Sequence, residues 1–175
     1  MTGGERTVLV DASVLITLAD TGSAALLAGL DGSVVVPDPV RREVTSDPAA
    51  KALSDAIDDG WVTCPQSVST AAVEEAASHL GRSDGDPRGD AVLLAHALVA
   101  ADPVVVTDDK PRRQTCKALS IPVAGSIGVL VRAVERGDIE PDDATETLYA
   151  MDEVGARFSA SLVRKAERLI DDAAD

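Results

Sequence analysis

The chain has 175 residues, of which 45% are hydrophobic, and its 30 acidic and 16 basic residues give a net charge of −14. This length suits one domain with a sizeable core, and the hydrophobic share excludes an intrinsically disordered chain. No apolar run is long enough for a transmembrane helix and the N-terminus does not resemble a secretory signal, so we expect a cytoplasmic protein. Cys64 and Cys116 are isolated in the sequence and are expected to be buried free thiols.

Short apolar runs alternate with segments of helical spacing. Strands are expected over residues 7–10, 33–36, 61–64, 103–107 and 121–125. Helices are expected over residues 12–20, 24–30, 37–44, 49–60, 68–81, 90–101, 110–120, 126–137, 141–154 and 159–175, with a loop over 82–89. Asp38 is expected to cap the helix that has Pro39 at its first position.

The strands are continuous apolar runs rather than alternating patterns, which indicates a parallel sheet covered on both faces. We therefore predict an α/β protein with a three-layer α/β/α fold and a central, mainly parallel sheet. Residues 1–175 are expected to form a single domain, on which the closing helices of about residues 141–175 pack.

Acidic residues follow several predicted strands. Asp11 ends the first strand, Asp108 and Asp109 end the fourth, and Glu43 lies on the helix after the second. Sites in open parallel sheets form outside the carboxyl ends of the strands, where these residues would meet. Asp90 opens the helix that precedes the fourth strand, and the sequence leaves open whether this helix begins at the same edge.

Carboxylates that converge repel one another unless a cation lies between them. Ligands that are all oxygen suit Mg²⁺ or Mn²⁺ rather than zinc, and neither His79 nor His96 has a metal-ligand partner at helical spacing. The alternative is structural: Asp11 and Asp90 would be helix caps, Glu43 a solvated acid, and the Asp108–Asp109 pair a capped turn into the next helix.

Four segments resemble, in order, the motifs of the PIN domain: VLVDASVLITLA, VVVPDPVRREV, GDAVLLAHA and VVVTDDK. PIN domains are small α/β metal-dependent ribonucleases, common as toxins of toxin–antitoxin pairs. The segment IPVAGSIGVLVRAVERGDI resembles a less characterised archaeal and bacterial subfamily. In many members of that subfamily a second glutamate stands where this chain has Val92. The resemblance covers about residues 6–155.

The resemblance implies a site as well as a fold. Its expected catalytic acids are Asp11, Glu43, Asp90 and Asp109, its metal ligands are Asp11 and Asp90 with Asp108 or Asp109, and Ser13 and Thr107 would orient the ligands. The Thr-x-Asp form of the last motif favours Asp109, whereas the spacing from the third acid favours Asp108, so both remain candidates.

A dense basic cluster lies beside this acidic pair. Lys110, Arg112 and Arg113 are expected to bind substrate phosphate or, alternatively, to form salt bridges along their helix.

The function expected from the resemblance is a Mg²⁺- or Mn²⁺-dependent endoribonuclease, with RNA as substrate and an antitoxin or a second copy of the chain as candidate partners. The alternative is a non-catalytic PIN-like module that binds RNA or protein. A haloacid-dehalogenase phosphatase needs an aspartate where Ser13 stands, and no P-loop is present.

The acidic composition resembles that of proteins from salt-loving archaea. A strongly acidic protein ordinarily repels nucleic acid. At molar salt the Debye length falls to about 3 Å, so local contacts would decide binding.

Overall fold

A five-stranded parallel sheet forms the centre of the molecule. The computed structural model describes residues 4–81 and 89–175, and its strands are β1 (Thr7–Val10), β2 (Ser33–Val35), β3 (Val62–Thr63), β4 (Pro103–Val106) and β5 (Val123–Ala124). Their order across the sheet is β3-β2-β1-β4-β5, with β1 central and Val10 paired with Val106. All five predicted strands are confirmed; β1 has the predicted bounds and the other four are shorter.

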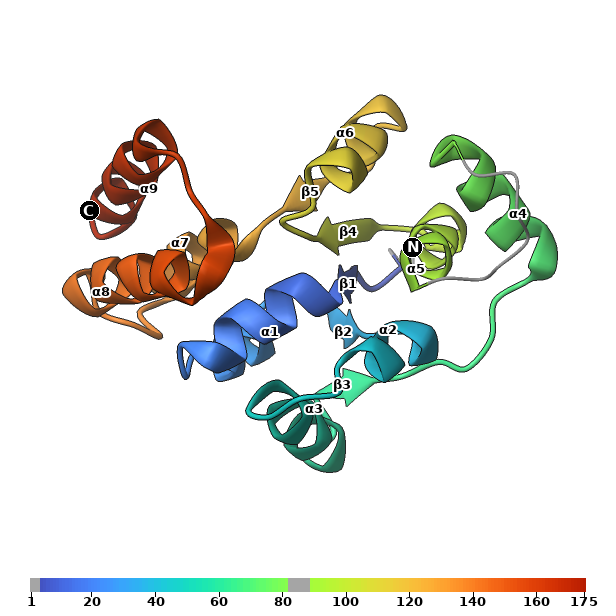
Figure 1. The fold of residues 1–175 in the computed structure, drawn as a ribbon, viewed down its shortest axis with the longest axis horizontal. Coiled ribbons are helices and arrows are strands. Elements are labelled where there is room, and N and C mark those ends of the chain that lie inside the picture. The colour runs from blue at the N-terminus through green and yellow to red at the C-terminus, as the bar shows by residue number, and fades with distance from the viewer. Residues whose placement is uncertain (1–3, 82–88) are drawn as a thin grey trace.

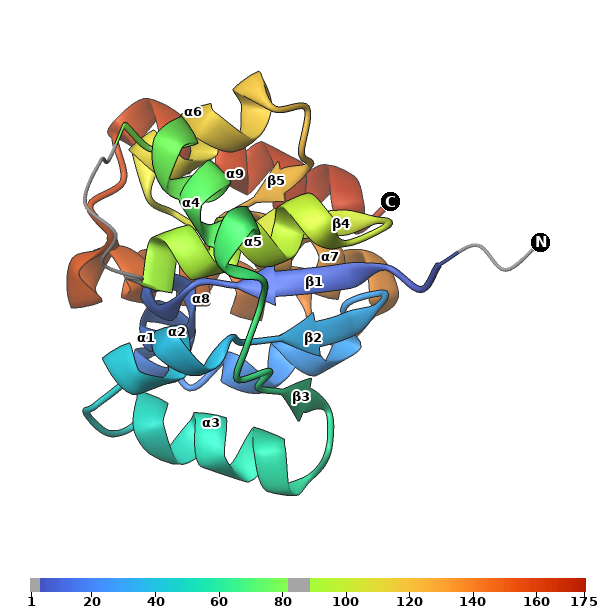
Figure 2. The same ribbon diagram turned by 90° about the vertical axis from the view of Figure 1, so that its right-hand side faces the viewer.

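Helices cover both faces of this sheet, so the predicted three-layer α/β/α fold is confirmed (Figure 1). One layer contains α1 (Ala12–Asp20), α3 (Ala49–Asp58) and α7 (Ser126–Arg136). The other contains α2 (Asp38–Glu43), α4 (Thr70–His79) and α5 (Gly89–Val99), with α6 (Lys110–Ala118) beside β5. Figure 2 shows α5 lying across β1 and β4.

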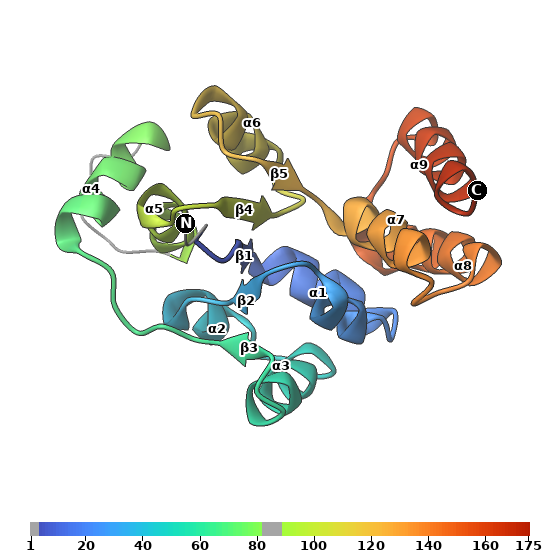
Figure 3. The same ribbon diagram turned by 180° about the vertical axis from the view of Figure 1, so that it is seen from behind.

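The C-terminal helices lie outside the first of these layers. They are α8 (Pro141–Met151), the π-helical turn η2 (Asp152–Ala156) and α9 (Ala160–Ala173). Their residues Leu148, Met151 and Ile170 are fully buried. Figure 3 shows from behind how α8 and α9 pack beside α7. None of the described helices is long and apolar enough to cross a membrane.

Helix α5 is the most deeply buried helix next to the sheet. Its residues 91–95 are all buried, which agrees with a sequence that is apolar on most sides. Because only residues 100–102 connect α5 to β4, the helix runs back along the strand that it precedes. Its first residue therefore lies at the carboxyl ends of the parallel strands.

Three expectations differ from the structure or lie outside it. The helix expected over residues 24–30 is the 3₁₀ segment η1 (Ala24–Gly29). The capping role expected of Asp38 is wrong, because its carboxylate accepts a 2.9 Å hydrogen bond from Arg41 Nε and pairs with Arg42 one turn later. The predicted loop lies outside the described residues except for its last position. Both cysteines are free thiols, Cys116 buried and Cys64 partly so.

Candidate active site

Asp11 and Thr107 lie side by side at the carboxyl ends of β1 and β4. They follow directly on the paired residues Val10 and Val106, and the Asp11 N–H donates to the Val106 carbonyl at 3.0 Å. The Thr107 hydroxyl donates to Asp11 Oδ2 at 2.7 Å, and the Ser13 hydroxyl donates to the same oxygen at 3.3 Å. Both Asp11 and Thr107 are buried, so these donors replace water around a charged carboxylate.

Asp90 joins the same edge of the sheet. As the second residue of α5 it lies where that helix begins, and its Oδ1 accepts a 2.9 Å hydrogen bond from the Ala91 N–H. It is buried, with 8% of its surface exposed. The antiparallel run of α5 along β4 thus answers the question that the sequence left open.

Asp108 and Asp109 are adjacent in sequence, but their carboxylates point to different elements. Asp109 caps α6, since its Oδ2 accepts from the Arg112 N–H at 3.0 Å, and its own N–H donates to Thr107 Oγ1 at 3.1 Å. The Asp108 Oδ1 accepts from the Ser126 N–H at 2.9 Å, at the start of α7. Asp109 therefore faces the acids at the strand ends, whereas Asp108 is directed away to α7.

The guanidinium of Arg112 lies among the acids. Its Nη1 donates to Asp11 Oδ2 in a very short contact, its Nη2 is 4.0 Å from Asp90 Oδ2, and its Nε is 3.8 Å from Asp109 Oδ2. The three carboxylates come from the end of β1, the start of α5 and the end of β4. One cation thus links three separate segments.

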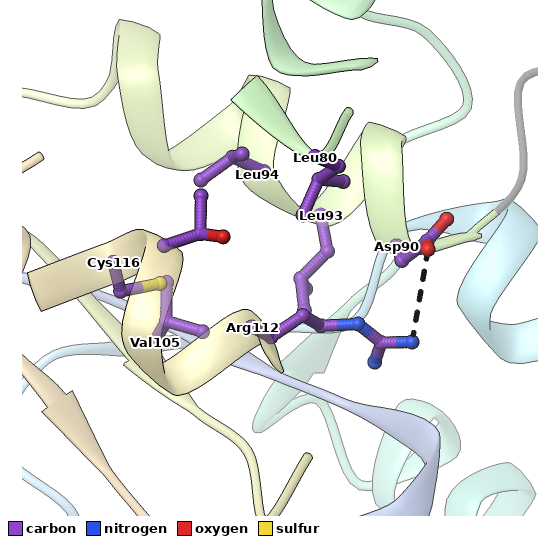
Figure 4. A pocket seen from close by; sticks show the side chains of 8 residues that line it. Leu80, Asp90, Leu93, Leu94, Val105, Arg112 and Cys116 are labelled. Carbon is purple, nitrogen blue, oxygen red and sulfur yellow. Dashed lines mark ion pairs between the residues drawn. The ribbon is translucent and has the colours of Figure 1, made fainter. Parts of the chain in front are cut away.

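Figure 4 shows how α6 directs this side chain. Arg112 lies at a small apolar cavity that has an accessible volume of about 10 Å³, room for about one water molecule. The cavity is lined by Leu80, Asp90, Leu93, Leu94, Val105, Arg112, Thr115 and Cys116. An arginine can keep its aliphatic stem on apolar surface of this kind while its charged end reaches the carboxylates.

The other two residues of the basic cluster lie elsewhere. Arg113 Nη1 donates to the Thr107 carbonyl at 3.0 Å, so it ties α6 to the end of β4. Lys110 is exposed and forms no ion pair with any residue in the described part of the chain. The three basic residues, which are close neighbours in the sequence, therefore lie in three different environments.

Glu43 stands at the rim of this group, at the end of α2. Its Oε1 accepts a 3.1 Å hydrogen bond from the Gly89 N–H at the start of α5. Partial burial of the carboxyl, followed by the negative charges of Asp11 and Asp90, raises the pKa of Glu43, and Arg112 counteracts this in part. Glu43 is thus an electrostatic neighbour of Asp11 and Asp90. Asp109 joins these acids through Arg112, whereas the Asp108 carboxylate is bonded to the start of α7.

The sequence matches the family model of the PIN domain over residues 7–172, nearly the whole chain. The chain belongs to the PIN-domain family. No curated protein matches it. The family identity agrees with the motifs that carry the acids, and it supports a nuclease-like protein.

PIN domains generally depend on divalent metals, so the question is whether the acids of this chain could hold one. The oxygen-only set of carboxylates has the right chemistry for Mg²⁺ or Mn²⁺. In the arrangement described, however, no three acidic, histidine or cysteine side chains of residues 4–81 and 89–175 are placed to hold one ion. The carboxylates therefore have the chemistry of a metal site, but the guanidinium of Arg112 lies where they converge.

Sequence reasoning missed two residues of this PIN domain that shape the site. Gly89 lies so close to the Glu43 carboxylate that any Cβ at this position would collide with it. Ser126 supplies the N–H that holds Asp108 away from the acids. Gly89 begins α5 and Ser126 begins α7. The sequence does not indicate which distant acid each of them contacts.

Proposed function

We propose that this PIN domain is a metal-dependent endoribonuclease that hydrolyses RNA phosphodiesters. The observation that carries the proposal is the approach of Asp11, Asp90 and Asp109 to one cationic group at the carboxyl ends of β1 and β4. Three carboxylates from separate segments at one buried edge are costly for the fold. Such a cost is typical of a site that serves a function rather than stability.

Each residue has a specific role in this proposal. Asp11, Asp90 and Asp109 would hold Mg²⁺ or Mn²⁺, which when bound supplies Lewis acidity and an activated water for attack on the phosphate. Ser13 and Thr107 fix the orientation of the Asp11 carboxylate through their hydroxyls. Asp108 is left out of the proposed ligand set, because its carboxylate is directed to α7 and, unlike that of Asp109, is not paired with Arg112 in the described part of the chain.

Two residues at the rim complete the proposed site. Glu43 has a raised pKa and lies beside the acids, so it is suited to accept or hold a proton near the phosphate. Lys110 is exposed next to Asp109 and can bind a phosphate of the RNA as a point charge. Arg113 is already engaged by a carbonyl, so we assign it a structural part.

The test is cleavage of a labelled single-stranded RNA with and without Mn²⁺. Asp90→Asn and Asp109→Asn should each reduce the metal-dependent rate by about tenfold or more, the change expected if about 1.4 kcal/mol of transition-state stabilisation is lost. Asp58→Asn removes the same charge from an exposed position of α3 and should leave the rate unchanged. Folded parent protein without metal-dependent cleavage of any RNA would contradict the proposal.

A second candidate is a non-catalytic PIN-like module that binds RNA or a protein. The observation that favours it is Arg112, which neutralises part of the acidic charge from within the chain. Such a module would bind its partner equally well with and without Mn²⁺. Binding of RNA that does not change when Mn²⁺ is added, together with no cleavage, would identify this alternative.

A toxin role is the more specific form of the nuclease proposal. If the chain is the toxin of a toxin–antitoxin pair, its expression without a partner should arrest bacterial growth. Asp90→Asn should then abolish the arrest at equal protein level. Growth that continues with the active parent protein would limit the proposal to RNA processing.

A further inference from the structure

The position of Arg112 has a consequence for metal binding. Asp11 Oδ2 accepts hydrogen bonds from three donors, the hydroxyls of Ser13 and Thr107 and the guanidinium of Arg112. A carboxylate oxygen offers about two lone-pair directions. This oxygen has no capacity left for a metal ion while all three donors remain.

The three donors are not equivalent. The two hydroxyls are neutral and belong to residues next to the strand ends, so they orient the carboxylate without opposing a second cation. Arg112 carries a full positive charge on a long side chain, of which 23% is exposed. Since two cations at one carboxylate cluster repel each other, the guanidinium is the group that a metal would replace.

Arg112 is also held loosely by the other two acids. Its distances of 4.0 Å to Asp90 and 3.8 Å to Asp109 exceed the approximately 2.7–2.9 Å of a charge-assisted hydrogen bond. Its Nε is buried and has no hydrogen-bond partner among the described residues. Within residues 4–81 and 89–175, the contact with Asp11 is the one close contact of the guanidinium with an acid.

We propose that Arg112 is the resident counter-ion of these carboxylates, and that the guanidinium and a divalent metal occupy the cluster alternately. Metal binding then requires Arg112 to leave Asp11, and in the metal-free protein Arg112 offsets part of the negative charge of the cluster. The inference rests on the proposed metal-dependent function. It goes beyond that function because it assigns to this chain an internal competitor that lowers its own metal affinity.

The experiment measures Mn²⁺ affinity by calorimetry and the metal-free melting temperature of three variants. Arg112→Gln should bind Mn²⁺ about tenfold or more tightly than the parent and melt at a lower temperature without metal. Arg112→Lys keeps the charge but loses the planar group, and its Mn²⁺ affinity should be intermediate. Lys117→Gln removes the same charge from the exposed last turn of α6, outside the site, and should match the parent in both measurements.

A second measurement uses the parent protein and does not depend on the folding of any variant. The Nε–H signal of Arg112 in a nitrogen-resolved NMR spectrum should shift on titration with diamagnetic Mg²⁺, whereas the Arg113 signal should stay in place. An Arg112 signal that keeps its position at saturating Mg²⁺ would overturn the proposal that the metal replaces the guanidinium.

The outcomes separate this inference from the function on which it rests. Equal Mn²⁺ affinity of the parent and Arg112→Gln would overturn the internal competition and leave the metal-dependent function standing. Metal binding by Arg112→Gln but not by the parent would show that the guanidinium excludes the metal completely from the carboxylates. If neither protein binds Mn²⁺, both the competition and the metal-dependent function are wrong.

Discussion

Thr107 Oγ1 lies 2.7 Å from Asp11 Oδ2 and joins the ends of the two central strands of the sheet. The same hydroxyl oxygen accepts the Asp109 N–H at 3.1 Å. One fully buried side chain thus positions the two acids that follow β1 and β4. A change at Thr107 should therefore affect both of them.

The first prediction concerns this hydroxyl. Thr107→Val keeps the shape and removes the hydrogen bonds, which leaves a buried carboxylate with one donor fewer. We expect the free energy of unfolding to fall by about 1–3 kcal/mol, measured by denaturant titration. Thr147→Val is the control, because the Thr147 hydroxyl donates to the Asp143 carbonyl within α8 in an exposed hydrogen bond and its loss should cost much less. Equal effects of the two changes would contradict a special role of Thr107.

The second prediction separates Asp108 from Asp109. Both carboxylates accept a backbone N–H at the start of a helix, so each change to alanine should lower stability by about 0.5–2 kcal/mol. Only Asp109→Ala should also lose the rise in melting temperature that Mn²⁺ gives the parent by mass action. Thermal melts with and without Mn²⁺ compare the two proteins, and a loss of the rise in Asp108→Ala instead would reverse the assignment.

The third prediction concerns the pH dependence of stability. The raised pKa of Glu43 means that its charged form costs free energy in the folded protein. This cost is absent below the unfolded pKa of about 4.5 and grows as the pH rises through the folded pKa. Glu43→Gln should therefore raise the metal-free melting temperature at pH 7 and have little effect near pH 4.

The control for this prediction is Glu74→Gln on the exposed face of α4. It removes an equal charge that does not contribute to the pKa shift of Glu43 and should show no such dependence. If Glu43→Gln stabilises the protein as much near pH 4 as at pH 7, the charge of Glu43 is not the cause.

The fourth prediction concerns salt. With a net charge of −14 the protein should repel RNA at low ionic strength, and few basic side chains are available for phosphate contacts. Raising KCl from about 0.1 M to about 1 M shortens the Debye length from about 10 Å to about 3 Å. We expect Mn²⁺-dependent RNA cleavage to increase over this range, with folding verified at each concentration. A steady decrease would indicate binding through phosphate contacts that release counter-ions.

Local sequence determined the elements and part of the site. Continuous apolar runs such as residues 103–106 favour strands of a covered sheet, and their alternation with helices indicates parallel connections. Since parallel strands end at one edge, the position of Asp11 beside the Asp108–Asp109 pair follows from the residues that precede them. The apolar surface of α5 likewise predicts its burial.

Only the tertiary structure decided how the charges are paired. The course of α5 along β4 brings Asp90 to the acids, and successive residues after a strand point in different directions, which separates Asp108 from Asp109. Among three neighbouring basic residues, the rotation of α6 against α5 directs Arg112 alone to Asp11. The composition of a segment cannot specify this choice, because it depends on helix phase and on side chains that are distant in the chain.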